Sequence, residues 1–432
     1  MKNAYIRTFG CQMNFHDSEK IMGILSKKGF KAVENPKEAD LIVFNTCSIR
    51  EKAEQKFYSE LGRLKSYKKR NPEVKIIISG CIAQQEGSNI LKNAPFVNFV
   101  VGPQNIFKIE RLLDECNSSV EVDDNPKLAF QELPVKRLNN IKAWVTIMYG
   151  CNNFCSYCVV PYTRGPERSR PSKNILNEVL ELSENGFKEI TLLGQNVNSY
   201  NSDIDFKELL KLVHGVGGIK RIRFVTSHPK DLSEDLIKTI ADLPKICEHI
   251  HLPLQSGSDK ILRLMNRGYT FSNYVEKIES LRKTFKDISI TTDIIAGFPQ
   301  ETEFDHEQTI KALKEIEFDG IFAFKFSKRP LALASKMDSQ IDEDTKSKRL
   351  NEILKIQEEI TLKKNKLLEG TIQEILIEGE SKTDITKLTG RTKTNKIVNI
   401  PKNENIKAGD IIRVLITNAR QHSLDGIPSK DI

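Results

Sequence analysis

The sequence contains no long hydrophobic segment. No uninterrupted apolar run reaches the about eighteen residues that a membrane-spanning helix needs, and the N-terminal stretch Met1–Arg7 lacks the character of an apolar secretion signal. We therefore expect a cytoplasmic protein without a membrane partner.

Neither sign of charge dominates the composition. The 432 residues include 66 Lys and Arg against 58 Asp and Glu, for a net charge of +8, and 39% of them are hydrophobic. This composition is that of an ordinary globular protein, and a chain of this length is expected to fold as two or three domains.

The cysteines lack the two close C-x-x-C pairs that are typical of zinc sites. Instead, Cys151, Cys155 and Cys158 form one C-x-x-x-C-x-x-C motif. Three thiolates can hold a four-iron cluster and leave its fourth iron open to a reactant. The motif therefore predicts an iron–sulfur site, and a zinc site completed from elsewhere in the chain is the alternative.

The first third of the chain alternates apolar runs with amphipathic segments, which predicts a parallel sheet with crossover helices. We expect strands at Ala4–Phe9, Leu41–Asn45, Lys75–Ser79 and Val97–Val101, and helices at His16–Lys28, Ile49–Arg70, Gln84–Lys92 and Gln104–Cys116.

Three further cysteines follow these expected strands closely, namely Cys11, Cys47 and Cys81. Because the carboxyl ends of parallel strands meet at one edge of a sheet, the three thiols should lie together. We predict a second three-cysteine cluster there, although a lone intracellular cysteine is commonly just a small buried residue. Cys116 and Cys247 share no such placement and are interpreted as structural thiols.

A second alternating block predicts a partial barrel with its chemistry at the carboxyl ends of the strands. The expected strands are Ala143–Tyr149, Glu189–Leu193, Arg221–Thr226, Glu248–Leu252, Ile288–Ile294 and Gly320–Phe324. Polar or glycine-containing turns follow each of them, which makes a site at that rim plausible. No Ser–His–Asp arrangement is indicated.

The last part of the chain reads as a long helix, Ile341–Leu368, followed by short β-like runs that fit a small barrel. Those runs are Thr371–Glu378, Leu388–Arg391, Lys396–Ile400 and Asp410–Thr417. The fold class is thus α/β, with an open parallel-sheet domain at 1–118, a polar linker at 119–138, a partial barrel of six βα units at 139–366 and a small antiparallel β-barrel at 367–432.

Two stretches are clearly basic. Lys52–Lys75 carries eight Lys or Arg against three Glu, and Lys127–Lys173 carries eight against two with aromatic residues interleaved. Such stretches suit an RNA backbone with splayed bases. A solvated helix face explains the first equally well, whereas the second contains the cysteine motif, and there we favour nucleic acid.

Several motifs resemble those of one enzyme family. The cysteine trio with Tyr157 resembles the signature of radical S-adenosylmethionine enzymes, and the segments Thr8–Asn14, Asn45–Ala53 and Ser79–Cys81 resemble the methylthiotransferases, in particular the branch acting on isopentenyl-adenosine in tRNA. The resemblance covers essentially the whole chain. Gly390-Arg391-Thr392 resembles part of the RNA-binding TRAM barrel, whereas Phe326–Ala332 lacks the Gly-Thr that commonly follows Arg-Pro.

The resemblance implies a transferase with two four-iron clusters, one on Cys151, Cys155 and Cys158 and an auxiliary one on Cys11, Cys47 and Cys81. S-adenosylmethionine would be both the radical source and the methyl donor, and sulfur would pass through the auxiliary cluster to carbon 2 of isopentenyl-adenosine at position 37, next to the anticodon. Alternatives are threonylcarbamoyl-adenosine tRNA or a ribosomal protein as substrate, and, more remotely, an RNA-binding scaffold with structural zinc.

The resemblance also implies roles for further residues and partners. The S-adenosylmethionine pocket would include Tyr157, Gln195, Asn196, Ser227, Gln255, Ser256, Asp293 and Gly297, and the substrate or a cluster would contact Arg164, Arg168 and Arg170. Expected partners of the monomer are the tRNA anticodon stem-loop, an electron donor such as flavodoxin or ferredoxin, and a sulfur or cluster-repair donor.

Overall fold

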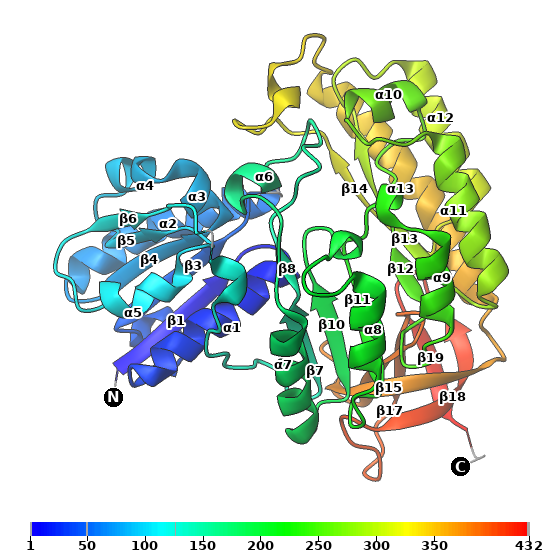
Figure 1. Ribbon diagram of the computed structural model, residues 1–432, viewed down its shortest axis with the longest axis horizontal. Helices are drawn as coiled ribbons and strands as arrows, with labels where there is room; N and C mark the ends of the chain where they lie inside the picture. Colours follow the sequence, from blue (N-terminus) through cyan, green and yellow to red (C-terminus); the bar gives the residue numbers. More distant parts are fainter. Residues whose placement is uncertain (1, 49–50, 126, 430–432) are drawn as a thin grey trace.

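A computed structural model describes residues 2–48, 51–125 and 127–429. Three bodies follow one another along the chain: a blue and cyan α/β sheet, a green and yellow half-barrel, and a red β-barrel beneath it (Figure 1). Within the described ranges, no helix combines the length and the apolar character needed to cross a membrane.

The first body is a six-stranded parallel sheet in the order β2-β1-β3-β4-β5-β6. Its strands are β1 Lys2–Thr8, β2 Phe30–Ala32, β3 Leu41–Thr46, β4 Lys75–Gly80, β5 Phe99–Val101 and β6 Ser119–Glu121. Its helices are α1 Gln12–Lys27, α2 Glu51–Arg70, α3 Cys81–Glu86, α4 Ser88–Asn93 and α5 Ile109–Leu112. The central strands β3, β4 and β5 are buried on both faces, which explains their nearly continuous apolar runs.

Three details differ from the sequence-based expectations. Strand β6 extends the sheet into residues that we expected to be linker. The helix expected at Gln84–Lys92 is divided into α3 and α4 at Gly87, whose φ of +49° interrupts the helix. Of the helix expected at Gln104–Cys116, only a 3-10 turn and the four residues of α5 form. Ile49 and Arg50 lie outside the described residues.

The central body carries the six expected strands in sequence order as two parallel three-stranded sheets, β11-β10-β7 and β12-β13-β14. A parallel bridge between Ile222 and Ile246 joins them. The strands are β7 Lys142–Thr146, β10 Glu189–Leu193, β11 Arg221–Phe224, β12 His249–His251, β13 Ser289–Ala296 and β14 Gly320–Lys325. The result is a half-barrel that stays open between β7 and β14.

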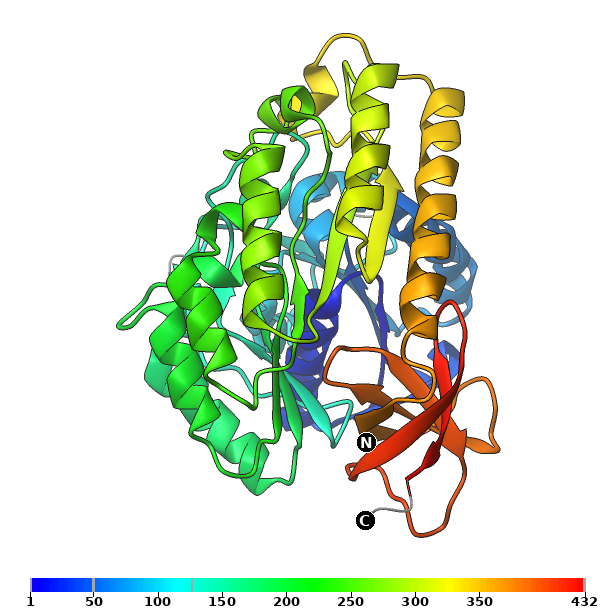
Figure 2. The ribbon, with the colours of Figure 1, turned by 90° about the vertical axis from the view of Figure 1, so that its right-hand side faces the viewer.

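Helices cover the outer face of this half-barrel (Figure 2). They are α7 Ser172–Glu184, α8 Phe206–His214, α9 Glu234–Ala241, α10 Asp259–Leu264, α11 Phe271–Thr284, α12 Glu303–Ile316 and α13 Glu343–Lys366. The apolar residues between helices and strands form the largest hydrophobic core of the described chain. The short elements β8 Met148–Tyr149, α6 Val160–Thr163 and β9 Arg168–Ser169 frame the loop that carries the cysteine trio.

The third body is a closed barrel in the order β15-β16-β17-β19-β18. Its strands are β15 Ile372–Glu380, β16 Lys387–Thr392, β17 Ile397–Pro401, β18 Ile411–Ala419 and β19 Leu424–Pro428. Neighbouring strands are antiparallel except β17 and β19, which are parallel. Two buried arginines of β11 fix this barrel against the half-barrel: Arg221 donates to the Arg391 carbonyl at 2.6 Å, and Arg223 donates to the Thr392 carbonyl at 2.8 Å.

Candidate active site

The first three predicted cysteines lie at one edge of the N-terminal sheet. Cys11 is the N-cap of α1, Cys47 follows β3 directly and Cys81 is the first residue of α3. Because β1, β3 and β4 are neighbours in the sheet, their carboxyl ends bring the thiols together. Gly10 permits this approach: a Cβ there would lie 2.4 Å from Cys47 Cβ, and its φ of +139° favours glycine.

Buried polar groups surround this triad. Cys11 Sγ donates to Asn14 Oδ1 at 3.3 Å, and the Asn14 amide donates to the Thr46 carbonyl at 3.0 Å. A hydrogen bond with Cys47 lowers the pKa of the Cys11 thiol to about 6 despite burial, and the charge of Arg164 acts in the same direction. The site therefore favours the thiolate form of Cys11, which is the form that binds iron.

The second predicted trio lies on the loop between β8 and α6. Cys151 and Cys155 are buried, and Cys158 is partly buried. Ser156 fixes the loop to the barrel, since its Oγ donates to the Leu264 carbonyl at 2.8 Å. Burial and the neighbouring Cys155 raise the pKa of the Cys158 thiol to about 12. Without an added positive charge this thiol stays protonated, whereas a bound iron would deprotonate it.

Arg267 is a site residue that the sequence did not reveal. It lies in the turn after α10 and is 4% exposed. Its Nη1 donates to Cys155 Sγ and to the Tyr157 hydroxyl, both at 3.3 Å, and its Nη2 donates to the Pro253 carbonyl at 3.0 Å. A buried guanidinium beside a cluster thiolate offsets negative charge at the iron site. A single arginine in a turn after a helix belongs to no sequence motif, so its contact with Cys155 could not be predicted from the sequence.

Elements that adjoin the two groups of cysteines meet at the domain boundary. Helix α3, which begins at Cys81, contacts α6, which begins two residues after Cys158 (Figure 1). Arg164, directly after α6, extends into the N-terminal domain, where its Nη1 lies 2.7 Å from Asp17 Oδ2. Burial opposes the charge of this arginine, but Asp17, Cys81 and Cys11 hold its pKa well above the usual value.

The residues fit iron–sulfur clusters in two respects. Each triad is a set of three cysteines, and Arg164 Nη2 is buried beside Cys11 and Cys81 without a hydrogen-bond partner among the described residues. Such a donor suits a sulfur atom of a cluster. In the part of the chain that the structure describes, no three His, Cys, Asp or Glu side chains are arranged to hold a single metal ion. A four-iron cluster differs in this respect, because each thiolate binds a different iron.

The residues predicted for the S-adenosylmethionine pocket lie mostly at the same rim of the half-barrel. Gln195 and Asn196 follow β10, Ser227 follows β11, and Gln255 and Ser256 follow β12. Gln195 Oε1 and Ser227 Oγ are buried without hydrogen-bond partners among the described residues, as expected of groups that receive a polar ligand.

The other members of this predicted set have intramolecular contacts. Asn196 donates to Asp231 Oδ2 at 2.6 Å, and Ser256 Oγ lies 3.3 Å from Thr309 Oγ1. Asp293, within β13, lies 3.4 Å from His251 Nε2. Gly297 has a φ of +71° and approaches Lys346 so closely that a Cβ would lie 2.3 Å from its Cγ. The roles of these residues toward a cofactor remain predictions.

The backbone is strained at this rim. Phe154, Thr226 and Gln255 have φ angles of +45°, +68° and +75°. A positive φ is costly for residues other than glycine, above all for a β-branched threonine. Such strain persists where the surrounding structure enforces it, and it concentrates at functional sites. Two of these residues directly precede the predicted Ser227 and Ser256, so the strain sets the position of both serines.

The three arginines predicted to contact substrate lie in different surroundings. Arg164 lies beside the Cys11 triad, as described above. Arg168 pairs with Asp124 at 2.6 Å. Arg170 is 3% exposed and pairs with Glu178 at 2.7 Å and with Glu132 at 2.9 Å.

In the second basic stretch, Arg137, Arg164 and Arg170 have acidic partners where the domains meet. Contact of this stretch with nucleic acid stays a prediction. The first stretch forms α2, which leaves Lys65 and Lys69 exposed. Its contact with RNA stays a prediction.

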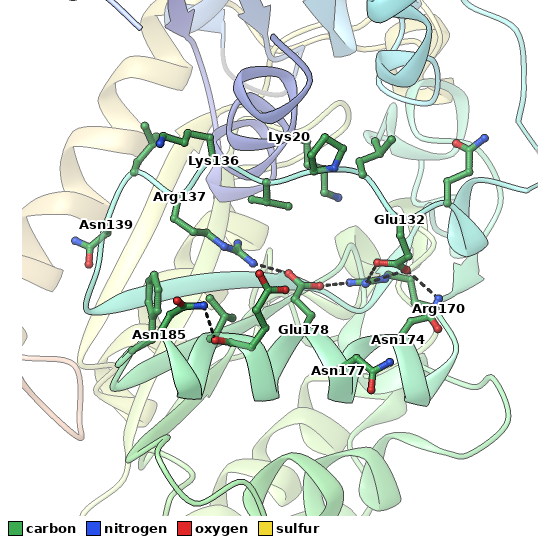
Figure 3. Close-up of a pocket in the computed structure, with 18 of the residues that line it drawn as sticks. Lys20, Glu132, Lys136, Arg137, Asn139, Arg170, Asn174, Asn177, Glu178 and Asn185 are labelled. Atoms are coloured by element: carbon green, nitrogen blue, oxygen red, sulfur yellow. Dashed lines mark hydrogen bonds and ion pairs between the residues drawn. The ribbon is translucent and has the colours of Figure 1, made fainter. Parts of the chain in front are cut away.

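Glu178 of α7 lies at the centre of the buried ion pairs where the domains meet (Figure 3). It accepts from Arg137 at 2.6 Å and from Arg170 at 2.7 Å, next to a cavity of about 880 Å³ between the linker and α7. None of the six predicted cluster cysteines lines this cavity. The cavity is part of the joint between the domains and lies apart from the cysteines.

A second interdomain ion pair lies at the outer rim. Arg329, in the loop after β14 that lacks the Gly-Thr, pairs with Glu54 of α2 at 2.6 Å. Together with Asp17 and Arg164, this pair joins the N-terminal domain to the half-barrel.

Sequence comparisons agree with this architecture. Residues 3–102 match a family described as Uncharacterized protein family UPF0004, residues 145–313 match the Radical SAM superfamily, and residues 366–428 match the TRAM domain. The fold is similar to that of TsrM, a radical S-adenosylmethionine methyltransferase from Kitasatospora setae, with a TM-score of 0.57 and 13% identity over 78% of this chain and 75% of that one. Fold and cysteine motif together define a radical S-adenosylmethionine enzyme.

Full-length relatives define the family more narrowly. A protein of Thermodesulfovibrio yellowstonii named tRNA-2-methylthio-N(6)-dimethylallyladenosine synthase is 56% identical over 425 residues, which cover 98% of both chains. A protein of the same name from Thermoanaerobacter pseudethanolicus is 47% identical over 98% of this chain and 93% of its own length. The chain belongs to the tRNA-2-methylthio-N(6)-dimethylallyladenosine synthase family.

Proposed function

We propose that this enzyme adds a methylthio group to carbon 2 of isopentenyl-adenosine at position 37 of tRNA, next to the anticodon. The observation that supports this most is the contact between α3, which begins at Cys81, and α6, which follows the Cys151 trio, with Arg164 of one domain beside Cys11 and Cys81 of the other. One reaction that needs both a radical source and a sulfur donor explains why two cysteine triads share one boundary.

The chemistry requires cofactors. The hydrogen on carbon 2 of adenine is neither acidic nor attached to a leaving group, so acid–base or nucleophilic side chains offer little. When bound, two four-iron clusters and S-adenosylmethionine would supply the radical, the sulfur and the methyl group.

The protein's own residues hold and shield these groups. Cys151, Cys155 and Cys158 would bind one cluster with Arg267 as a charged neighbour, and Cys11, Cys47 and Cys81 would bind the auxiliary one beside Arg164. Ser227 and Gln195 offer polar atoms to S-adenosylmethionine, together with the other predicted pocket residues. Burial of the thiols limits the access of water to a reactive radical.

Several finer points belong to the same proposal. The anticodon stem-loop is the RNA element that enters, the enzyme acts as a monomer in the cytoplasm, where its tRNA substrate is, and a flavodoxin or ferredoxin supplies electrons. A separate donor restores the sulfur of the auxiliary cluster. The proposed domain limits are 1–118, 139–366 and 367–432, with 119–138 as the linker.

The substrate is tested by mass spectrometry of tRNA nucleosides from a strain that lacks the gene and from the same strain carrying it. We expect the methylthio derivative of isopentenyl-adenosine to vanish and to return with the gene. If it persists in the deletion strain, or if a threonylcarbamoyl-adenosine derivative disappears instead, the proposed substrate is wrong.

The division of labour between the triads is tested by two variants. We expect Cys151→Ala to abolish S-adenosylmethionine cleavage, and Cys47→Ala to retain cleavage but lose sulfur insertion, because Cys47 lies in the other domain. Equal loss of both activities in Cys47→Ala, with the iron of the Cys151 cluster retained, would contradict this division.

A further inference from the structure

A crevice of about 440 Å³ lies away from both cysteine triads, where β14, α13 and the C-terminal barrel meet. In Figure 2 the orange helix α13 descends toward the red barrel at this junction. The volume falls within the range of small-ligand sites. Its walls combine an aromatic ring, two side-chain amides whose oxygens have no hydrogen-bond partner among the described residues, and side chains of both charges.

The aromatic wall is Phe322, at 51% exposure. Strand alternation places its neighbours Ile321 and Ala323 against the hydrophobic core, so Phe322 is on the opposite face of β14. The ring contacts the edge of His251, with centroids 5.7 Å apart at 74°. A phenylalanine that stays half-exposed on an ordered strand offers a surface on which a planar ligand can stack.

Two buried side-chain amides on α13 also line the crevice. Gln357 is 5% exposed and Asn365 is 3% exposed. The Gln357 NH₂ group donates to the Phe318 carbonyl at 2.8 Å, and the Asn365 NH₂ group donates to the Arg420 carbonyl at 2.8 Å.

These contacts fix the orientation of both amides, because a carbonyl accepts only from the NH₂ end. Gln357 Oε1 and Asn365 Oδ1 therefore remain as acceptors, and neither has a hydrogen-bond partner in the described part of the chain. A buried acceptor of this kind requires a donor. The crevice thus suits a ligand that carries N–H or O–H groups.

The C-terminal barrel contributes cations and an unused donor. Arg391 and Lys396 line the crevice, where they pair with Glu378 at 3.2 Å and Asp319 at 3.3 Å. Gln421 Nε2 is buried and has no partner among the described residues. A nucleotide has a stacking face, amino or hydroxyl donors, and acceptors, and so matches Phe322, the two amide oxygens and Gln421 Nε2.

The crevice also adjoins the half-barrel strand that carries Asp293. Phe322 pairs in register with Asp293 on the adjacent strand, and neighbouring strands are about 4.8 Å apart. Asp293 is one of the residues predicted for the S-adenosylmethionine pocket. A nucleotide in the crevice would therefore lie between the RNA-binding barrel and the chamber that receives the target base.

We propose that this crevice is a second nucleotide site, which holds one unpaired, amino-bearing nucleotide of the anticodon loop while the target adenosine occupies the reaction chamber. The proposal rests on the proposed function, because it takes the loop of the same tRNA as its ligand. Stacking on Phe322 and donation to Gln357 and Asn365 would fix the position of the loop.

The test compares Phe322→Ala with the matched variant Phe304→Ala, whose phenylalanine is 66% exposed on α12 and does not line the crevice. The cluster-loaded full-length enzyme is titrated with a synthetic isopentenylated anticodon stem-loop RNA, by fluorescence anisotropy. Phe322→Ala is expected to raise Kd by about 5- to 150-fold, the effect of losing one base–aromatic stack. Phe304→Ala should bind like the parent, and Phe322→Trp, which retains a stacking face, should bind nearly as well.

Abasic substitution at each loop position then identifies the nucleotide. An abasic site at one loop position other than the target should raise the Kd of the parent. It should not raise the Kd of Phe322→Ala any further, because this variant has already lost the ring on which that base stacks. Equal Kd values for the parent and Phe322→Ala would overturn the crevice proposal. A change of oligomeric state in Phe322→Ala would also overturn it, because the crevice would then be a contact with a second copy of the chain. If the parent forms no methylthio product on this RNA, the proposed function itself fails.

Discussion

Removal of the Asp17 carboxylate should weaken the docking of the N-terminal domain. Asp17 and Arg164 are both about 5% exposed or less and lie 2.7 Å apart. At an effective dielectric constant of about 20, their attraction is about 6 kcal/mol. Desolvation offsets part of it, and the loss of one partner from a buried pair typically costs about 3–5 kcal/mol. Asp17→Ala should therefore lower the free energy of the domain-separating transition by about 3–5 kcal/mol.

The single tryptophan gives a direct assay. Trp144 of β7 lies against Phe15 of α1 with ring centroids 5.9 Å apart, so its fluorescence reports the contact between the domains. We would follow anaerobic urea titrations of the parent and Asp17→Ala by this signal. Asp114→Ala is the control, because the Lys28–Asp114 pair has a similar distance of 2.9 Å but 32% and 72% exposure, and its loss should leave the transition nearly unchanged.

A double-mutant cycle with Arg164→Gln isolates the ion pair. The double variant should be less destabilised than the sum of the single variants, because removing both charges leaves neither one buried alone. A Trp144 transition in Asp17→Ala that coincides with that of Asp114→Ala would refute the buried interdomain pair.

Two further predictions concern the half-barrel. Arg267→Ala should reduce S-adenosylmethionine cleavage by about 10- to 150-fold, the range expected from losing a charged hydrogen bond of about 1.5–3 kcal/mol to Cys155. Arg263→Ala, which removes an exposed arginine of α10, should cleave at the parental rate. Parental cleavage in Arg267→Ala would contradict the assigned contact. Burial raises the pKa of Asp305, but hydrogen bonds from Lys260, Thr302 and Ser258 outweigh it and lower the pKa from 3.8 to about 2. The ionised carboxylate therefore contributes about 2 kcal/mol to the free energy of unfolding above pH 4, and this contribution is lost as the pH falls through about 2. Urea titrations of Asp305→Asn and the parent should therefore differ by about this amount at pH 7 and converge in acid, and a difference that does not depend on pH would be evidence against the shifted pKa.

The sequence predicted the order of the three bodies because hydrophobic periodicity is a local property. The expected strands at Glu189–Leu193 and Leu41–Asn45 differ from β10 and β3 by at most one residue. Predictions failed where the outcome depends on distant partners. Strand β6 is only three residues long and forms because β5 offers an unpaired edge. Strand β19, for which no expectation was made, closes the last barrel between β17 and β18.

The candidate site was likewise predictable only where the signal is local in the sequence. The cysteine spacing and its strand context indicated both triads, since thiols after strands gather at one sheet edge. The contacts of Arg164 with Asp17, and of Arg267 with Cys155, join residues more than about a hundred positions apart. Such pairs leave no periodic signal. The basic residues of Lys127–Lys173 were similarly ambiguous, because the sequence does not show which arginines are enclosed by carboxylates.

The central claim, two separate cluster sites in one chain, is tested most directly by anaerobic iron and sulfide analysis of the parent and of two triple variants, one with Cys11, Cys47 and Cys81 replaced by alanine and one with Cys151, Cys155 and Cys158 replaced. About eight irons per chain are predicted for the parent and about four for each variant, since each triad would hold one four-iron cluster. About four irons in the parent, all lost in one variant and unaffected in the other, would contradict the account, as would stoichiometric zinc in place of iron.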